Sequence, residues 1–193
     1  MTTRILVSTT TYPPDLGGVA VSAARIVDSL VSAGLAVHVV VPRDEPGASG
    51  RVSRSEEGGA TIHRLHHETS TSPEAGLDLH RLVRDLDDEF GFDLFYAVFL
   101  LSAYPCLTVA RRGGRSRPVI AGIQGGDATT LLDFPPCRRM ILEVLRKATW
   151  IVSVNHLYLE RVGRWVDVRD RSTVIPTAVA PPRGQSGWSL SGV

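Results

Sequence analysis

A pair of glycines near the N-terminus has the residue type and position that anion binding requires. Gly17-Gly18-Val19 ends a polar loop over residues 9–19, which follows an apolar run at 5–8 and precedes an apolar-periodic segment from Ala20. Glycines let the backbone approach a ligand closely, and a helix start offers unpaired N–H groups with a partial positive charge. The pattern predicts a phosphate or carboxylate site. The alternative is a tight surface turn made by Tyr12-Pro13-Pro14 and the glycines.

A second glycine-rich turn, Gln124-Gly125-Gly126-Asp127, directly follows the apolar run at 119–123. The carboxyl ends of parallel strands meet at one edge of a sheet, so this turn should face the same crevice as the first loop. Asp127 fits a catalytic general base or an acceptor of hydrogen bonds from sugar hydroxyls. It fits equally well as the cap of a helical turn over residues 128–132.

A third polar cluster follows the apolar run at 151–154. Ser153 and Asn155 are candidates for substrate contacts at the same edge, although Asn155 also fits as the N-cap of the next helix. His156 fits best as an exposed residue at that helix start.

Other kinds of chemistry find little support in the chain. The spaced glycines of a nicotinamide dinucleotide site and the Gly-Lys-Ser/Thr of a P-loop are missing, and no nucleophile elbow occurs. His63, His66 and His67 come nearest to a metal pattern, but alternation along a strand keeps them from converging. We therefore expect no metal and no resident cofactor.

The elements that position these residues follow from hydrophobic periodicity. Helical spacing occurs over 20–33, 77–90, 102–112, 138–147 and 157–166, between apolar runs of strand length. This alternation predicts an α/β fold: a single Rossmann-like domain with a mostly parallel, seven-stranded sheet and helices on both faces. The predicted strands are 5–8, 37–41, 61–65, 94–98, 119–123, 151–154 and 174–175.

Composition limits the organisation and the partners. The 193 residues suit one domain, predicted over 1–180, with a Pro-, Gly- and Ser-rich tail or interdomain linker at 181–193 and an irregular mobile loop at 42–59. The net charge of +1 gives no basic field for nucleic acid. The two cysteines form no disulfide framework, and the short N-terminal apolar run is no signal peptide. We expect a cytoplasmic protein, either free or peripheral at the inner face of the membrane.

The order of these motifs resembles the N-terminal domain of GT-B glycosyltransferases of family 4. The resemblance covers residues 4–180 and rests on Tyr12-Pro13-Pro14, Gly17-Gly18-Val19, the turn 124–127, and the closing segments 152–153 and 174–180. It implies sugar transfer from a nucleotide-sugar donor with retention of anomeric configuration. Gly17 and Gly18 would lie near the donor phosphates and the acceptor, and Asp127 near the transferring sugar or the acceptor.

The chain departs from the family pattern at two motifs. Gln124 stands where many relatives have a His or Arg, so it supplies no cation. The closing segment has Thr177-Ala178 and Ala180 in place of Asn-Gly and an aspartate.

The family also binds its donor mainly through a C-terminal domain with two glutamates, which we do not find in this chain. We therefore expect acceptor-side machinery that needs a C-terminal donor-binding domain or subunit, and a small-molecule or glycan acceptor. Exposed apolar residues near 176–181 would favour self-association.

Three interpretations follow from the sequence. The chain is the acceptor-binding half of a retaining glycosyltransferase, or a non-catalytic companion that binds or stabilises a complete glycosyltransferase, or an unrelated small nucleotide-binding Rossmann domain.

Overall fold

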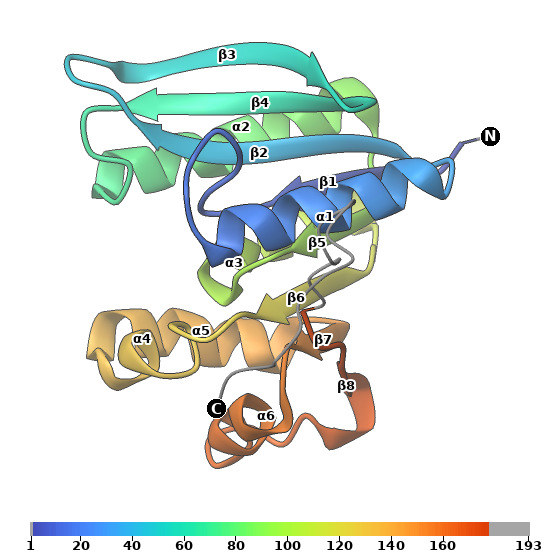
Figure 1. Cartoon of the computed structure of the whole chain (residues 1–193), viewed down its shortest axis with the longest axis vertical. Coiled ribbons are helices and arrows are strands. Elements are labelled where there is room, and N and C mark those ends of the chain that lie inside the picture. The colour runs from blue at the N-terminus through green and yellow to red at the C-terminus, as the bar shows by residue number, and fades with distance from the viewer. Residues whose placement is uncertain (1, 178–193) are drawn as a thin grey trace, which may run out of the picture.

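The computed structural model describes residues 2–177. Its centre is one sheet of eight strands in the order β3-β4-β2-β1-β5-β6-β7-β8, from top to bottom in Figure 1. All neighbours pair in parallel except β3 and β4, which are antiparallel. The predicted α/β class is confirmed, with eight strands in place of seven. The strands are β1 (Arg4–Ser8), β2 (Ala36–Asp44), β3 (Ser49–Glu57), β4 (Ala60–His67), β5 (Leu94–Ala97), β6 (Val119–Ile123), β7 (Trp150–Ser153) and β8 (Ser172–Val174).

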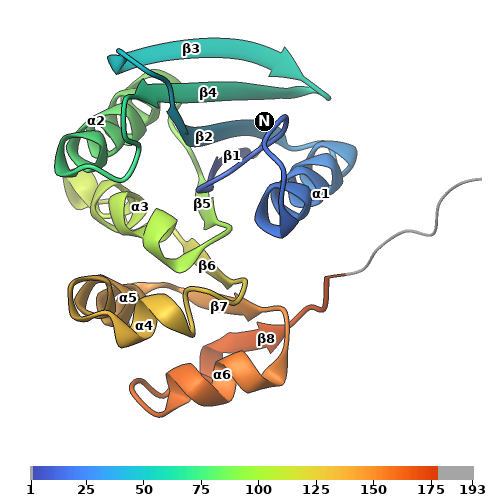
Figure 2. The same cartoon turned by 60° about the vertical axis from the view of Figure 1, so that its left-hand side comes forward.

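The helices divide unequally between the two faces of the sheet (Figure 2). On one face lies α1 alone, which packs with Ile5, Val7 and Val39 of the central strands. Side chains of α2, α3, α5 and α6 join the larger core on the other face, which contains Leu6, Phe95 and Ile151. The helices are α1 (Gly18–Ser32), α2 (Pro73–Phe90), α3 (Ala103–Ala110), α4 (Thr130–Asp133), α5 (Pro135–Lys147) and α6 (His156–Gly163), with short 3-10 turns η1 (Leu100–Ser102), η2 (Arg112–Gly114) and η3 (Arg169–Arg171).

The additional strand lies in the segment that was predicted to be an irregular loop, so that prediction is wrong. Residues 49–57 form β3, an edge strand that turns into β4 through Gly58 and Gly59. Both glycines have positive φ angles, 57° and 85°, which suits a tight two-residue hairpin turn. Val52 is the only large apolar residue of the strand, so hydrophobic periodicity could not find it. The predicted tail at 181–193, and residues 178–180 of the closing segment, lie outside the described residues.

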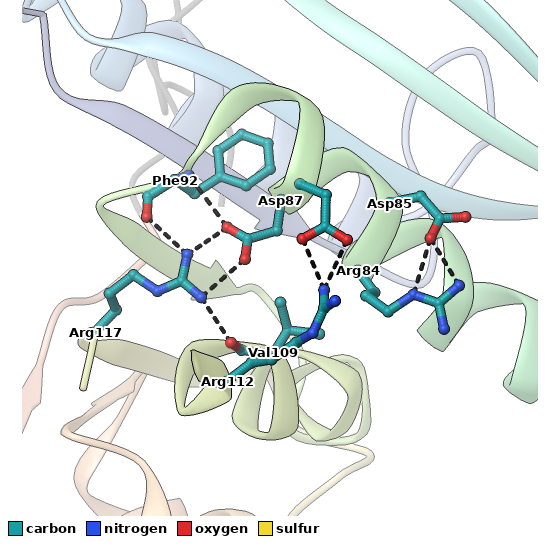
Figure 3. Close-up of polar contacts among 8 residues, drawn as sticks. Arg84, Asp85, Asp87, Phe92, Val109, Arg112 and Arg117 are labelled. Carbon is teal, nitrogen blue, oxygen red and sulfur yellow. Dashed lines mark hydrogen bonds and ion pairs between the residues drawn. The ribbon is translucent and has the colours of Figure 1, made fainter. Parts of the chain in front are cut away.

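A buried ion pair joins α2 to the start of β6 (Figure 3). The two Nη atoms of Arg117 donate to the two carboxylate oxygens of Asp87, and the side chains are only 11% and 7% exposed. Arg117 also donates to the carbonyl oxygens of Phe92 (3.1 Å) and Val109 (2.6 Å), and Asp87 accepts from the backbone N–H of Phe92. The pair therefore fixes the end of α2 and the end of α3 against the sheet.

Two buried histidines on neighbouring strands share a hydrogen bond. Nδ1 of His38 lies 3.1 Å from Nε2 of His63, and both rings are covered by Phe90 of α2. Burial, aided by His38 and Arg54, lowers the pKa of His63 to about 4, and burial also lowers the pKa of His38. Both rings are therefore neutral at pH 7.

We expect this pair to make the fold acid-sensitive. The unfolded chain binds these protons at the ordinary histidine pKa, whereas the folded chain resists binding them. The free energy of unfolding is therefore highest above about pH 6.5 and declines as the pH falls towards 4. The loss due to His63 between pH 7 and pH 4.5 should be about 2 kcal/mol. Urea unfolding at pH 7 and pH 4.5 measures this loss. His63→Phe should lose less stability than wild type over this interval. The control, His80→Gln at an exposed position, should lose as much stability as wild type. Equal losses in all three proteins would contradict the assignment.

Candidate functional site

The three predicted motifs lie along one edge of the sheet, where β1, β6 and β7 end. The strand order places β5 between β1 and β6, so the first loop and the turn 124–127 are two strand spacings apart, about 10 Å. The cluster after β7 is one strand further along. The topology thus brings the motifs to a common edge, as the sequence predicts.

The first loop is anchored at one end and open at the other. The Thr9 hydroxyl donates to the carbonyl of Thr11 (3.0 Å), and the buried ring of Tyr12 packs into the core beneath α1. The Asp15 carboxylate accepts from the backbone N–H of Tyr12 (3.3 Å), which closes the turn. Beyond it, Leu16 is 98% exposed. The predicted ligand-binding residues follow this exposed tip.

Among the described residues, the N-terminus of α1 is exposed and has no side-chain cap. Its N-cap is Gly17, which has φ 139° and so adopts a backbone conformation that other residues rarely take. No side chain caps the helix, and the first turn carries no acidic residue. Gly17 and Gly18 are exposed, Val19 is partly buried, and nothing lies within 4 Å of a Cβ added at Gly18. The first N–H groups of α1 therefore point to an open approach, the geometry that anion binding uses.

Asp127 is fully buried and bonded to backbone N–H groups. One carboxylate oxygen accepts from Gln124 (3.1 Å), Gly125 (2.8 Å) and Ala128 (3.1 Å), and the other from Leu100 (3.2 Å). Burial raises the pKa of Asp127, and these N–H donors oppose the rise. The side chain thus ties the turn after β6 to the η1 turn after β5. It does not cap a helix over 128–132, because α4 begins at Thr130 with Thr129 as its N-cap.

A carboxylate with no exposed surface is poorly placed to take a proton from an acceptor hydroxyl. The arrangement around Asp127 favours a role in positioning the turn, and a catalytic role stays a prediction.

The glycines of this turn differ in their freedom. Gly125 has φ 143°, and an added Cβ would lie 3.1 Å from the Tyr158 hydroxyl of α6, so the position requires glycine. Gly126 is exposed, and a Cβ added there would lie 4.0 Å from the Phe99 ring. Gly126 therefore presents backbone that a substrate could approach.

The polar side chains after β7, Ser153 and Asn155, make hydrogen bonds within their own segment. Asn155 is the N-cap of α6, since its side chain accepts from the backbone N–H of Tyr158 (2.9 Å). The buried hydroxyl of Ser153 donates to the carbonyl of Asn155 (2.8 Å). His156 is exposed at the first position of α6. The capping role predicted for Asn155 is confirmed, and substrate contacts by Ser153 and Asn155 stay predictions.

A groove of about 820 Å³ runs between α1 and the sheet face that α1 leaves uncovered. Of the predicted substrate-binding residues, Gln124 lines it, partly exposed and uncharged. Its other walls come from α1, β5, β7 and the segment after β8: Ser22, Arg25, Ile26, Asp28, Ser29, Leu30, Tyr96, Val152, Val154, Ile175, Pro176 and Thr177.

One contact to the first loop was not predicted from the sequence. Arg64 of β4 donates to the carbonyl oxygen of Pro13 (2.8 Å) and is itself paired with Glu57 of β3. The signal that could have revealed the hairpin is Gly58-Gly59 between two segments of strand length.

In the described part of the chain, the histidines at 63, 66 and 67 do not converge on one point. The three histidines of 63–67 have separate partners: His63 contacts His38, His66 contacts Ser53 and Glu45, and His67 contacts Asp78. Over residues 2–177, no group of three or more His, Cys, Asp or Glu side chains is arranged to hold a metal ion. None of the helices in the same residues combines the length and hydropathy of a membrane-spanning segment.

A mostly parallel sheet with glycine turns and an uncapped helix at its carboxyl edge defines a Rossmann-like domain. The model of the family described as Glycosyltransferase Family 4 matches residues 16–183. The chain therefore belongs to glycosyltransferase family 4. No curated protein matches it.

Solved structures show the same fold at low sequence identity. Sucrose-phosphate synthase from Thermosynechococcus elongatus has a TM-score of 0.74 and 12% identity, over 92% of this chain and 48% of that one. HepE from Anabaena, in complex with UDP and glucose, has a TM-score of 0.64 and 12% identity, over 91% and 44%. A trehalose-phosphate synthase from Burkholderia xenovorans, in complex with glucose-6-phosphate, has 0.52 and 13%, over 84% and 43%.

These similarities establish a GT-B half-domain. The chain spans about half the length of these proteins. Family membership also removes the interpretation as an unrelated nucleotide-binding domain.

Proposed function

We propose that this chain is the acceptor-binding half of a retaining glycosyltransferase that uses a nucleotide-sugar donor. A C-terminal donor-binding domain or a partner subunit completes the active site. The open N-terminus of α1 behind Gly17 and Gly18 carries the proposal, because it is an exposed, uncapped set of N–H donors at the sheet edge. Family membership and the match to about half of each solved relative support it.

Within this proposal the chain contributes backbone and neutral polar groups. The N–H groups at Gly17-Gly18-Val19 face donor phosphates or an anionic acceptor, and the turn 124–126 contacts acceptor hydroxyls through the Gln124 side chain and the exposed Gly126. Asp127, Ser153 and Asn155 hold the loops that present these groups. The nucleotide sugar is a co-substrate, and the proposal includes no metal.

Calorimetry with nucleotide sugars tests the division into halves. The isolated chain should bind UDP- and GDP-sugars weakly or not at all, whereas addition of the donor-binding half should produce a measurable heat. Micromolar binding to the isolated chain would overturn the proposal in this form.

Gly18 offers the corresponding mutational test. Gly18→Leu should abolish transfer in the completed enzyme, since the side chain fills the approach to the first turn of α1. The fold should remain intact because Gly18 has no neighbour within 4 Å of an added Cβ. Gly163→Leu is the matched control, at a similarly open position at the other end of the fold, and should keep both fold and activity. Unchanged turnover in Gly18→Leu would remove this loop from the site.

One observation favours a second candidate function. The turn after β6 carries the uncharged Gln124, and its carboxylate, Asp127, is buried. A non-catalytic companion of a complete glycosyltransferase needs no charged group there. Mixing the chain with a complete transferase of the same source distinguishes the two: a companion raises the stability or activity of an enzyme that already has both halves, whereas a half-enzyme does not.

A further inference from the structure

We propose that Arg64 is a positioning residue for the first loop, and that the β3–β4 hairpin holds this loop in its ligand-binding conformation. The inference rests on the proposed function, because it concerns the loop that ends at Gly17 and Gly18. It also gives a role to the edge hairpin, which lies outside the three predicted motifs.

The contacts of Arg64 form a chain from the hairpin to the loop. Its Nη2 donates to the carbonyl oxygen of Pro13 (2.8 Å), fifty-one residues earlier in the sequence. Its Nη1 donates to the hydroxyl of Ser55 (2.9 Å) and to the Glu57 carboxylate (2.7 Å) on β3. Ser55 in turn donates to Glu57 (2.7 Å). Ser55 and Glu57 on β3 therefore orient the guanidinium, which in turn bonds the first loop at Pro13.

An arginine is required by this geometry. The Arg64 side chain is 10% exposed, and Glu57, at 39%, balances its charge. A planar guanidinium can bond Glu57 with both Nη atoms and still reach Pro13, whereas a lysine ammonium is a single point donor. Substitution by lysine should retain the charge and lose part of the orientation.

The bonded carbonyl lies at a sensitive point of the loop. Tyr12, just before Pro13, is buried. After Pro13 the chain continues through Asp15 to the exposed Leu16 and then to the N-cap of α1. A fixed Pro13 carbonyl thus limits how far the tip can swing away from the helix start. Without it, the N–H groups of α1 would face a loop with more conformations, and binding would carry a larger entropy cost.

Hydrogen exchange followed by mass spectrometry tests the positioning role directly. In Arg64→Ala, the hydrogen-bonded amides of Tyr12 and Asp15 in the loop should exchange at least about tenfold faster, with little change in β1, β5 and β6. Arg64→Lys should give an intermediate increase, and guanidinium ion should slow exchange again in Arg64→Ala. The matched control is Ser53→Ala, which removes a hydroxyl that contacts His66 on the same hairpin and should leave loop exchange unchanged.

Kinetics of the completed enzyme provide the functional readout. Arg64→Ala should lower kcat/KM at least about tenfold, with partial rescue by guanidinium ion, and Ser53→Ala should match wild type. Unchanged loop exchange in both Arg64 variants, or a uniform increase across all strands, would overturn the inference. If Arg64→Ala does not fold, Arg64→Lys decides by the same two criteria. The exchange measurement needs no turnover, so an inactive wild-type enzyme would count against the proposed function alone.

Discussion

Asp87→Ala should lower the free energy of unfolding by about 3–5 kcal/mol, because it leaves the buried guanidinium of Arg117 without its counter-charge. The cost is concentrated in Arg117, which would keep its carbonyl contacts to Phe92 and Val109 but lose both bonds to the carboxylate. The Phe92 N–H would also lose its acceptor. Urea denaturation at pH 7 gives the value.

The adjacent residue provides a matched control. Asp88 of the same helix pairs with Arg112 (2.7 Å), but these side chains are 57% and 48% exposed. Exposed pairs are screened by solvent, so Asp88→Ala should lower the free energy of unfolding far less than Asp87→Ala does. Similar losses in the two variants would show that burial does not set the strength of the Asp87–Arg117 pair.

Hydrophobic periodicity was sufficient for most of the fold. The apolar runs at 5–8 and 119–123 are β1 and β6 almost to the residue, because strands covered on both faces need continuous apolar sequence. Gly91, with φ 65°, ends α2 at the predicted position. The common edge of the candidate site followed from the same pattern, since parallel topology fixes where loops after strands must lie.

Features that depend on pairs of distant polar residues were not predictable in this way. Edge strand β3 is polar, so its hairpin could be found only from the glycine turn at 58–59. The contact between Arg64 and Pro13 depends on the hairpin register, which no local pattern specifies. The burial of Asp127 depends likewise on the approach of the η1 turn, through the N–H of Leu100.

Asp127→Asn should destabilise the domain by about 2–4 kcal/mol. An asparagine has one carbonyl oxygen for the N–H groups that the two carboxylate oxygens now accept, and its amide group would meet N–H donors in a fully buried site. Asp133→Asn is the control, because Asp133 is 66% exposed and pairs with Arg161 at the surface. Its loss should stay within about 1 kcal/mol in urea denaturation.

The same variant separates positioning from catalysis at Asp127. A general base contributes an ionisation to the pH dependence of kcat/KM, so its replacement by asparagine removes one limb of that profile. A positioning carboxylate instead lowers the rate at every pH and leaves the shape of the profile unchanged. Because Asp127 has no exposed surface and bonds to four backbone N–H groups, we expect the second result in the completed enzyme, together with the loss of stability. An Asp127→Asn protein as stable as wild type, with an altered pH profile, would instead establish Asp127 as the base.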